Sequence, residues 1–234
     1  MADAPGSLGS FARVAAAIVR KDAAIEMRGR ELVYTTLFFA VACVLVFSFG
    51  LVEQGRAPLG VSAGILWIAI AFSGTLALGR TFDRERTSAT LPVLLLAPAD
   101  RPAVYVGKLA GIVALMLTVE VAVVPLVSLF FGAPFWQAPF HFAGLLLTGT
   151  VGFAAVGTLF AAMLVGTRGR DILLPILLYP ITVPVIIAGV RGTAAVLEGA
   201  DALPMARAWL AMLGFFDVVF VTLALWTFES AVTE

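Results

Sequence analysis

Long apolar runs alternate with short polar stretches along this chain, and six of the runs are long enough to cross a bilayer as helices. A hydrocarbon core about 30 Å thick needs about 20 apolar residues in helical form. The runs cover residues 32–52, 61–79, 109–131, 142–165, 172–190 and 208–228. Because they are continuously apolar and do not alternate, they do not fit the strands of a membrane barrel. The pattern predicts an all-α membrane protein with a six-helix transmembrane domain over residues 32–228.

The segment that precedes the first run is helix-compatible and amphipathic. It reads FARVAAAIVRKDAAIEMRGRE over residues 11–31. Its apolar face would hold Phe11, Val14, Ile18 and Ile25, with Arg13 and Arg20 roughly opposite and Asp22 as an interruption. This pattern is typical of a helix that lies in the membrane interface, here over residues 1–31. The alternative is a basic flanking segment that happens to be helical.

Basic residues are segregated along the chain, although the formal net charge is zero. Twelve fall on one side of the predicted bundle: Arg13, Arg20, Lys21, Arg28, Arg30, Arg80, Arg84, Arg86, Arg101, Lys108, Arg168 and Arg170. Three fall on the other side: Arg56, Arg191 and Arg207. Since lysine and arginine accumulate in cytoplasmic loops, both termini are expected in the cytoplasm. Residues 229–234 would then form a short cytoplasmic tail, and residues 191–208 a short helical element at the outer surface.

The composition agrees with membrane insertion and leaves little for enzyme chemistry. The chain is 61% hydrophobic and 13% charged, whereas soluble domains are about 45–50% apolar and about 25% charged. One cysteine, Cys43, and one histidine, His141, supply no zinc site, Cys/His pair or disulfide. Gly107 and Lys108 lack the upstream glycine of a phosphate-binding loop, so the chain is not expected to hydrolyse ATP by itself. We expect no metal site, and His141 is a weak candidate for a haem ligand.

Ionisable residues inside apolar runs are the main functional candidates. Lys108 lies near the cytoplasmic end of the third run, from which its ammonium group is expected to extend towards water, and this favours a structural role. Glu120 lies roughly 17 Å in from Leu109 and Asp217 roughly 12 Å in from Trp209. These two runs start on opposite sides of the membrane, so the two acids can occupy a similar depth. An intramembrane carboxylate is a candidate for a transport pathway. The alternative is a protonated acid that donates a hydrogen bond to a neighbouring helix.

The fifth run contains Pro175, Pro180 and Pro184, and this spacing predicts a kinked or locally unwound helix. Irregular backbone at membrane depth is tolerated where it is buried or lines a cavity. Pro180 and Pro184 are therefore candidates for a pathway or a moving interface. A tightly packed bundle explains the same pattern, because the fourth run is rich in glycine and alanine.

Residues 83–101 read DRERTSATLPVLLLAPADR, a charged run followed by a short apolar block. The eight residues of LPVLLLAP reach only about 12 Å as a helix, so they cannot span a bilayer. Thr90 is a suitable N-cap and Pro98 stops the helix, which predicts about two helical turns on the cytoplasmic side. The exposed leucines require a protein groove or lipid as a partner surface.

Several of these segments, taken in order, resemble the haem exporter B permease family of cytochrome c maturation, the CcmB family. They are SAGILWIA at 62–69, LLLAP at 94–98, Tyr105 with Gly107 and Lys108, and LLPILLYPITVP at 173–184. The similarity extends from about Arg20 to the last run. Gly79 and Pro92 stand where the family is expected to carry acidic residues.

The resemblance implies an ABC-2-type permease subunit of a bacterial inner-membrane complex, usually a homodimer. Residues 80–101 would be the coupling segment that contacts a separate ATP-binding subunit (CcmA-like). The contact residues would be Arg84, Glu85, Arg86, Leu94, Leu95, Leu96 and Pro98. The alternative for the leucine block is a re-entrant turn in lipid.

The resemblance also implies a haem-handling membrane protein (CcmC-like) and a small subunit (CcmD-like) as further partners, with no role for nucleic acid. Haem would be a substrate, ATP would bind the partner, and no cofactor would bind this chain directly. Two other functions remain open. One is an ABC-2 exporter of lipid, glycan or drug, and the other is a non-transporting mechanical subunit that releases a haem-loaded chaperone.

Overall fold

The structure, a computed structural model, describes residues 8–51, 59–87 and 101–231. All regular elements in these ranges are helical. The α-helices are α1 (Leu8–Gly29), α2 (Glu31–Leu51), α3 (Leu59–Thr87), α5 (Arg101–Phe131), α6 (Pro139–Met163), α7 (Arg170–Glu198) and α8 (Leu203–Ala231). Two short 3-10 helices, η1 (Phe135–Gln137) and η2 (Ala200–Ala202), join neighbouring helices. Six of the α-helices, all except α1, are long and apolar enough to cross a membrane, which confirms the predicted all-α membrane class.

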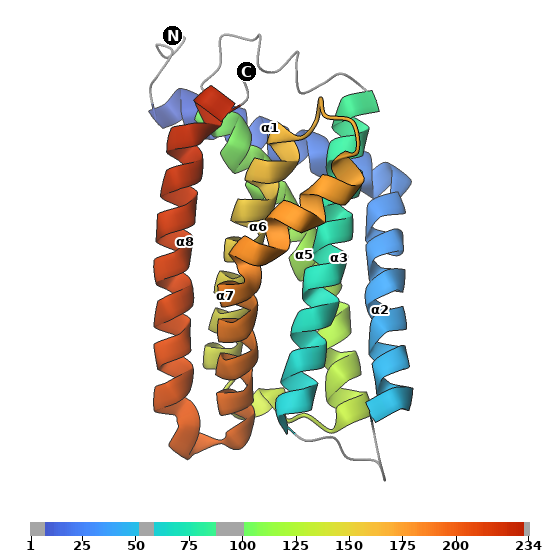
Figure 1. The fold of residues 1–234 in the computed structure, drawn as a ribbon, viewed down its shortest axis with the longest axis vertical. Helices are drawn as coiled ribbons and strands as arrows, with labels where there is room; N and C mark the ends of the chain where they lie inside the picture. Colours follow the sequence, from blue (N-terminus) through green and yellow to red (C-terminus); the bar gives the residue numbers. More distant parts are fainter. Residues whose placement is uncertain (1–7, 52–58, 88–100, 232–234) are drawn as a thin grey trace.

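The six long helices form an upright bundle, and α1 lies across one end of it (Figure 1). We call this end the α1 end and the opposite one the far end. Helices α2, α5 and α7 begin at the α1 end, whereas α3, α6 and α8 finish there. All twelve basic residues that the sequence groups together therefore lie at or near the α1 end. Arg191 and Arg207 lie towards the far end, in the last turns of α7 and the first turns of α8.

The predicted separate helical element over residues 191–208 is wrong. Residues 191–198 continue α7, and α8 already begins at Leu203. The helix continues because this part of it packs into the bundle: Thr193, Val196 and Leu197 are buried. It ends at Gly199, whose φ of 102° is a conformation that favours glycine.

The predicted helix before the first span is confirmed as α1. Only part of its predicted apolar face packs against the bundle. Ile18 is buried and Val14 packs against the core. Gly107 of α5 lets α1 approach closely, since a Cβ at this position would lie 2.9 Å from Ile18 Cβ. Ile25 lies two turns further along the same face as Ile18, yet it is 42% exposed. It borders a cavity between α1 and the bundle, so no side chain packs over it there.

Trp67 is the central packing element between α3, α6 and α7. Its side chain is 1% exposed, and its indole N–H donates a 2.9 Å hydrogen bond to the Thr193 hydroxyl. Two glycines make room for the ring. A Cβ on Gly149 of α6 would lie 2.1 Å from its Cη2, and one on Gly189 of α7 would lie 2.4 Å from its Cε2. Small residues thus bring the helices together around one large aromatic ring.

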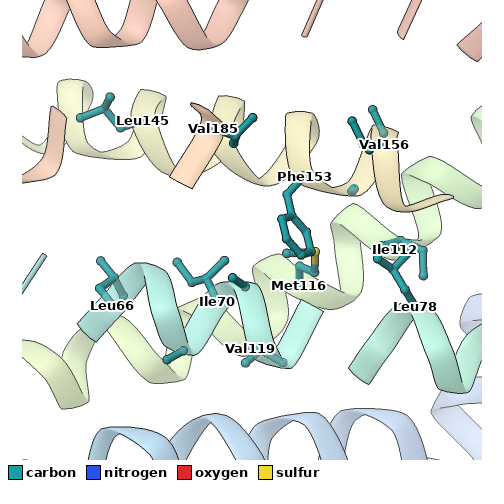
Figure 2. Close-up of a cluster of buried hydrophobic side chains, with 14 of the residues drawn as sticks. Leu66, Ile70, Leu78, Ile112, Met116, Val119, Leu145, Phe153, Val156 and Val185 are labelled. Atoms are coloured by element: carbon teal, nitrogen blue, oxygen red, sulfur yellow. The ribbon is translucent and has the colours of Figure 1, made fainter. Parts of the chain in front are cut away.

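A second apolar layer continues this packing towards the α1 end. Figure 2 shows Met116 of α5 and Phe153 of α6 directed towards each other among Ile70, Val119 and other buried side chains. Gly74 of α3 allows this contact, because a Cβ there would lie 2.7 Å from the Met116 Cε. The interior between α3, α5 and α6 is therefore filled by side chains.

Helix α7 runs as one helix from Arg170 to Glu198 and is visibly bent along its length (Figure 1). Pro175, Pro180 and Pro184 all lie inside it. Each removes a backbone donor and crowds the preceding turn, which explains the bend. The expected kink is confirmed, whereas local unwinding is not observed.

The packing around Trp67 gives a first prediction. Gly189→Ala places a methyl group against the indole ring and is expected to destabilise the chain by about 1–3 kcal/mol through overpacking. Thermal unfolding in detergent, followed by size-exclusion fluorescence, measures the loss. Gly214→Ala in α8 is the matched control, because no atom lies within 4 Å of its added Cβ. Equal melting temperatures for the two variants would contradict the prediction.

Candidate functional site

A buried ion cluster at the α1 end joins α1, α3 and α5. The Lys108 side chain is 2% exposed, and its ammonium group lies 2.8 Å from Asp22 Oδ2 and in close contact with Glu85 Oε1. Lys21 completes the cluster, with its Nζ 3.0 Å from Glu85 Oε1 and 3.1 Å from Asp22 Oδ1. The expectation that Lys108 extends towards water is wrong. Two carboxylates from other helices solvate the ammonium group inside the protein, so it does not need to reach water.

The four charges of this cluster balance, with two cations and two carboxylates. Burial by itself lowers the pKa of Lys21. The hydrogen bond to Glu85 and the charges of Asp22 and Glu85 outweigh burial, so the pKa of Lys21 is raised above its ordinary value. Lys21 therefore stays protonated at neutral pH.

Glu26 connects the same end of the bundle to α2. Its Oε1 accepts a 3.0 Å hydrogen bond from the backbone N–H of Val33, in the first turn of α2, and its Oε2 lies 3.3 Å from Arg84 Nη1. A carboxylate at this position satisfies a free backbone donor at the start of the helix and favours its dipole. Between α1 and α2 the chain turns at Arg30, whose φ of 53° is unusual for a residue with a side chain.

A third ion pair fixes the start of α7 against α3. The buried Arg170 side chain donates from Nη2 to the Gly79 carbonyl at 2.7 Å and lies 2.6 Å from Asp83 Oδ1. Its Nε and Nη1 are buried without a hydrogen-bond partner among the described residues. The last turns of α3 are thus tied to α1, α5 and α7 at once.

The residues predicted to contact an ATP-binding subunit have different surroundings. Arg86 is exposed, and Arg84 is half-buried beside Glu26. Glu85 is buried in the Lys108 cluster, so it faces the interior of the chain and not a partner surface. Leu94, Leu95, Leu96 and Pro98 lie outside the described residues.

The two intramembrane carboxylates lie on opposite sides of α6. Glu120 of α5 is 3% exposed, and its Oε1 accepts a short hydrogen bond from the Thr150 hydroxyl. Asp217 of α8 faces Gly152, where a Cβ would lie 2.6 Å from Asp217 Oδ1. Thr150 and Gly152 are two residues apart on α6, which corresponds to about 3 Å along its axis. The two acids share a level, as expected, with α6 between them.

Each of these acids has one buried oxygen that no described residue satisfies, namely Glu120 Oε2 and Asp217 Oδ1. Polar atoms without partners inside a membrane bundle are unfavourable and mark functional candidates. Pro180 and Pro184 do not join this region. Both are exposed on the outer face of α7, whereas Leu178 and Val185 on the inner face are buried. A pathway along these prolines would therefore run over the surface of this chain.

His141 lies at the far end, near the start of α6. Its Nε2 accepts a 3.2 Å hydrogen bond from Arg207 Nε, which joins α6 to α8. Within the described residues, no group of three or more histidine, cysteine, aspartate or glutamate side chains is placed to hold a metal ion.

The fold and the charge distribution define a class. Six long apolar helices, with their basic residues gathered at the end where α1 lies, make this chain a multi-pass helical membrane protein of the permease type. The chain belongs to the CcmB protein family, whose model matches residues 13–234. This confirms the resemblance that the sequence motifs carry.

Individual relatives agree with the family assignment. The chain is 32% identical to Heme exporter protein B of Paracoccus denitrificans over 195 residues, which cover 83% of this chain and 85% of the relative. It is 33% identical to Heme exporter protein B of Rhodobacter capsulatus, over 83% of this chain and 85% of the relative. The protein of that name from Escherichia coli K12 is 29% identical over 84% of this chain and 87% of its own length.

Removal of the Lys108 charge is expected to destabilise the chain strongly. Lys108→Met removes the buried cation shared by the buried Glu85 and the partly buried Asp22, and breaking a buried charge pair in this way costs about 3–5 kcal/mol. Thermal unfolding in detergent measures the loss. Lys21→Met is the matched control, and its effect should be under about 1 kcal/mol because the Lys21 side chain is 33% exposed. A larger loss of stability for Lys21→Met than for Lys108→Met would contradict the prediction that Lys108 contributes more to stability.

Proposed function

We propose that this chain is the membrane permease subunit of an ABC transporter complex that acts in haem export and haem-chaperone release during c-type cytochrome biogenesis. Membership of the CcmB family carries this proposal. The relatives named Heme exporter protein B, which match over most of the chain, support haem as the substrate. The chain itself is not an enzyme, and ATP hydrolysis belongs to a separate ATP-binding subunit.

The complex is placed in the bacterial inner membrane, with the α1 end and both termini in the cytoplasm. The twelve basic residues at the α1 end support this orientation, because lysine and arginine accumulate on the cytoplasmic side. The partners in this proposal are a second copy of the chain, the ATP-binding subunit, a haem-handling membrane protein and a small subunit.

The ATP-binding subunit contacts the coupling segment between α3 and α5. Three features at the end of α3 support transmission of its motion: Glu85 pairs with Lys108 of α5, Arg84 with Glu26 of α1, and Asp83 with Arg170 of α7. A displacement of the end of α3 therefore moves three other helices together.

One observation favours a second function, a mechanical subunit that releases the haem-loaded chaperone without carrying haem. The space between α3, α6 and α7 is filled by Trp67, and Pro180 and Pro184 lie on the outer face. The force on a partner would then come from movement of the outer surface of the bundle.

Reconstitution of the whole complex in liposomes separates these functions. Haem transfer into the lumen is measured with an enclosed apo-haem reporter protein, and chaperone release is measured in the same vesicles. ATP-dependent transfer supports haem export. Release without transfer supports the mechanical subunit, whereas the absence of both would favour an exporter of another substrate.

The coupling assignment gives a further prediction. Leu95→Asp with Leu96→Asp should insert normally and lose at least about tenfold of the co-purified ATP-binding subunit, because charged side chains replace apolar ones. The control, Leu95→Ile with Leu96→Ile, keeps both side chains apolar and should retain the subunit. Wild-type retention by the aspartate variant would place these leucines in lipid and remove the coupling role.

The intramembrane acids are proposed to act in the moving part of the permease. Glu120→Gln keeps an acceptor for the Thr150 hydroxyl, and Asp217→Asn keeps the side-chain size. The double variant should therefore melt like the wild type and lower cytochrome c maturation in cells at least several-fold. Glu198→Gln and Asp201→Asn are matched controls, since both residues are exposed at the far end. Wild-type maturation in the double variant would assign Glu120 and Asp217 a structural role only.

A further inference from the structure

A cavity of about 730 Å³ lies at the α1 end between α1, α2, α3 and α5. We call it the α1 cavity. Its volume falls within the range of about 300–1,000 Å³ that is typical of small-molecule sites. The cavity is bordered by the helix that crosses the end of the bundle and by three helices that span it, so it lies where a membrane interface meets the hydrocarbon core.

The lining of the α1 cavity is amphipathic. Its charged side chains are Lys21, Asp22, Glu26, Arg30, Arg84, Glu85 and Lys108. From these, an apolar stripe runs along one face of α5 through Gly111, Ala114, Leu115 and Thr118. Residues 108 and 118 are separated by about 15 Å along the helix axis. A molecule that fits both parts has a polar head and an apolar tail.

The charged part has a surplus of positive charge. Among the described lining residues, four cations and three carboxylates leave a net charge of +1. Lys21 and Lys108 pair with Asp22 and Glu85, and Arg84 pairs with Glu26. Arg30 is exposed, and its side chain makes no ion pair or hydrogen bond with the residues that the structure describes. The head group that complements this arrangement is therefore an anion that contacts Arg30.

The apolar part contains side chains that border the cavity and remain uncovered by protein. Ile25 follows the inward register of Ile18 and is nevertheless 42% exposed, and Tyr34 in the first turn of α2 is also exposed. In a membrane, an opening at this level is filled by acyl chains, which are as apolar as these side chains. Tyrosine at an interface is typical of contact with lipid head groups.

We infer that the α1 cavity binds one anionic phospholipid, with its phosphate at Arg30 and one acyl chain along the Gly111 to Thr118 face of α5. The site is independent of the substrate named in the proposed function. Haem fits the cavity less well, because its two propionates exceed the single surplus charge of the described lining. A bound lipid would stabilise the position of α1 against α5 by filling the space between them.

Native mass spectrometry tests the inference directly. The full-length chain, with the subunits that co-purify, is reconstituted into nanodiscs of equimolar phosphatidylglycerol and phosphatidylcholine and then released in the gas phase. The wild type should retain one phosphatidylglycerol per chain after other lipids are removed. Arg30→Gln should lower this retention by about tenfold, since it loses a charge-assisted hydrogen bond. Arg28→Gln, an exposed arginine outside the cavity lining, should leave retention unchanged.

A second pair of variants tests the apolar part. Ala114→Trp fills the stripe and should abolish retention of either lipid. Ala110 lies one turn earlier on α5, is also exposed and is not among the described lining residues, so Ala110→Trp should retain the lipid. Three results would overturn the inference: equal retention of both lipids by the wild type, undiminished retention in Ala114→Trp, or retention of haem with no lipid. Should Ala114→Trp not fold, the comparison of Arg30→Gln with Arg28→Gln decides alone.

Discussion

The buried ammonium group of Lys108 sets the arrangement of the α1 end. A cation removed from water is tolerated only when opposite charges and hydrogen bonds replace its hydration. Lys108 obtains them from Asp22 of α1 and Glu85 of α3. Because these residues lie on three helices, the position of each helix depends on the other two. Helix α1, which lies across the end of the bundle, is thereby fixed to α3 and α5.

Packing deeper in the bundle follows a different constraint. Lipid is as apolar as leucine, so burial of apolar surface gives little driving force between helices and close contact must provide it. Gly149 and Gly189 provide this contact around Trp67, and Gly74 provides it around Met116. The bundle therefore has a closely packed apolar interior and a charged end whose cavity remains open. A closely packed interior resists displacement. Helices can therefore move more easily at the α1 end, beside the cavity, than around the Trp67 indole ring.

Hydropathy and charge alone could predict the number of spans, a helix before the first span and the end of the bundle at which the basic residues gather, because each depends on local composition. The charge cluster could not be predicted in this way, since Asp22 and Lys108 are 86 positions apart and Lys21 and Glu85 are 64 apart. Two signals of the charge cluster were visible in the sequence: Asp22 interrupts an apolar helix face, and Lys108 interrupts an apolar run. The extent of α7 was also missed, because Arg191, Thr193 and Glu198 make this stretch look too polar to continue the helix, whereas Thr193 is buried and accepts a hydrogen bond from Trp67.

Helix α5 connects the two regions that carry the functional candidates. It holds Lys108 at the charged end and Glu120 about 18 Å further along its axis. A helix transmits displacement along its axis with little loss, since its backbone hydrogen bonds are all internal. If a partner moves the segment between α3 and α5, α5 is displaced directly and the Lys108 cluster shifts α1 with it. The same displacement changes the position of Glu120 relative to Thr150 of α6, and Asp217 lies on the other side of that helix. A small shift of α5 against α6 therefore alters the contacts of Glu120. The contacts of Asp217 depend instead on the position of α8 against α6.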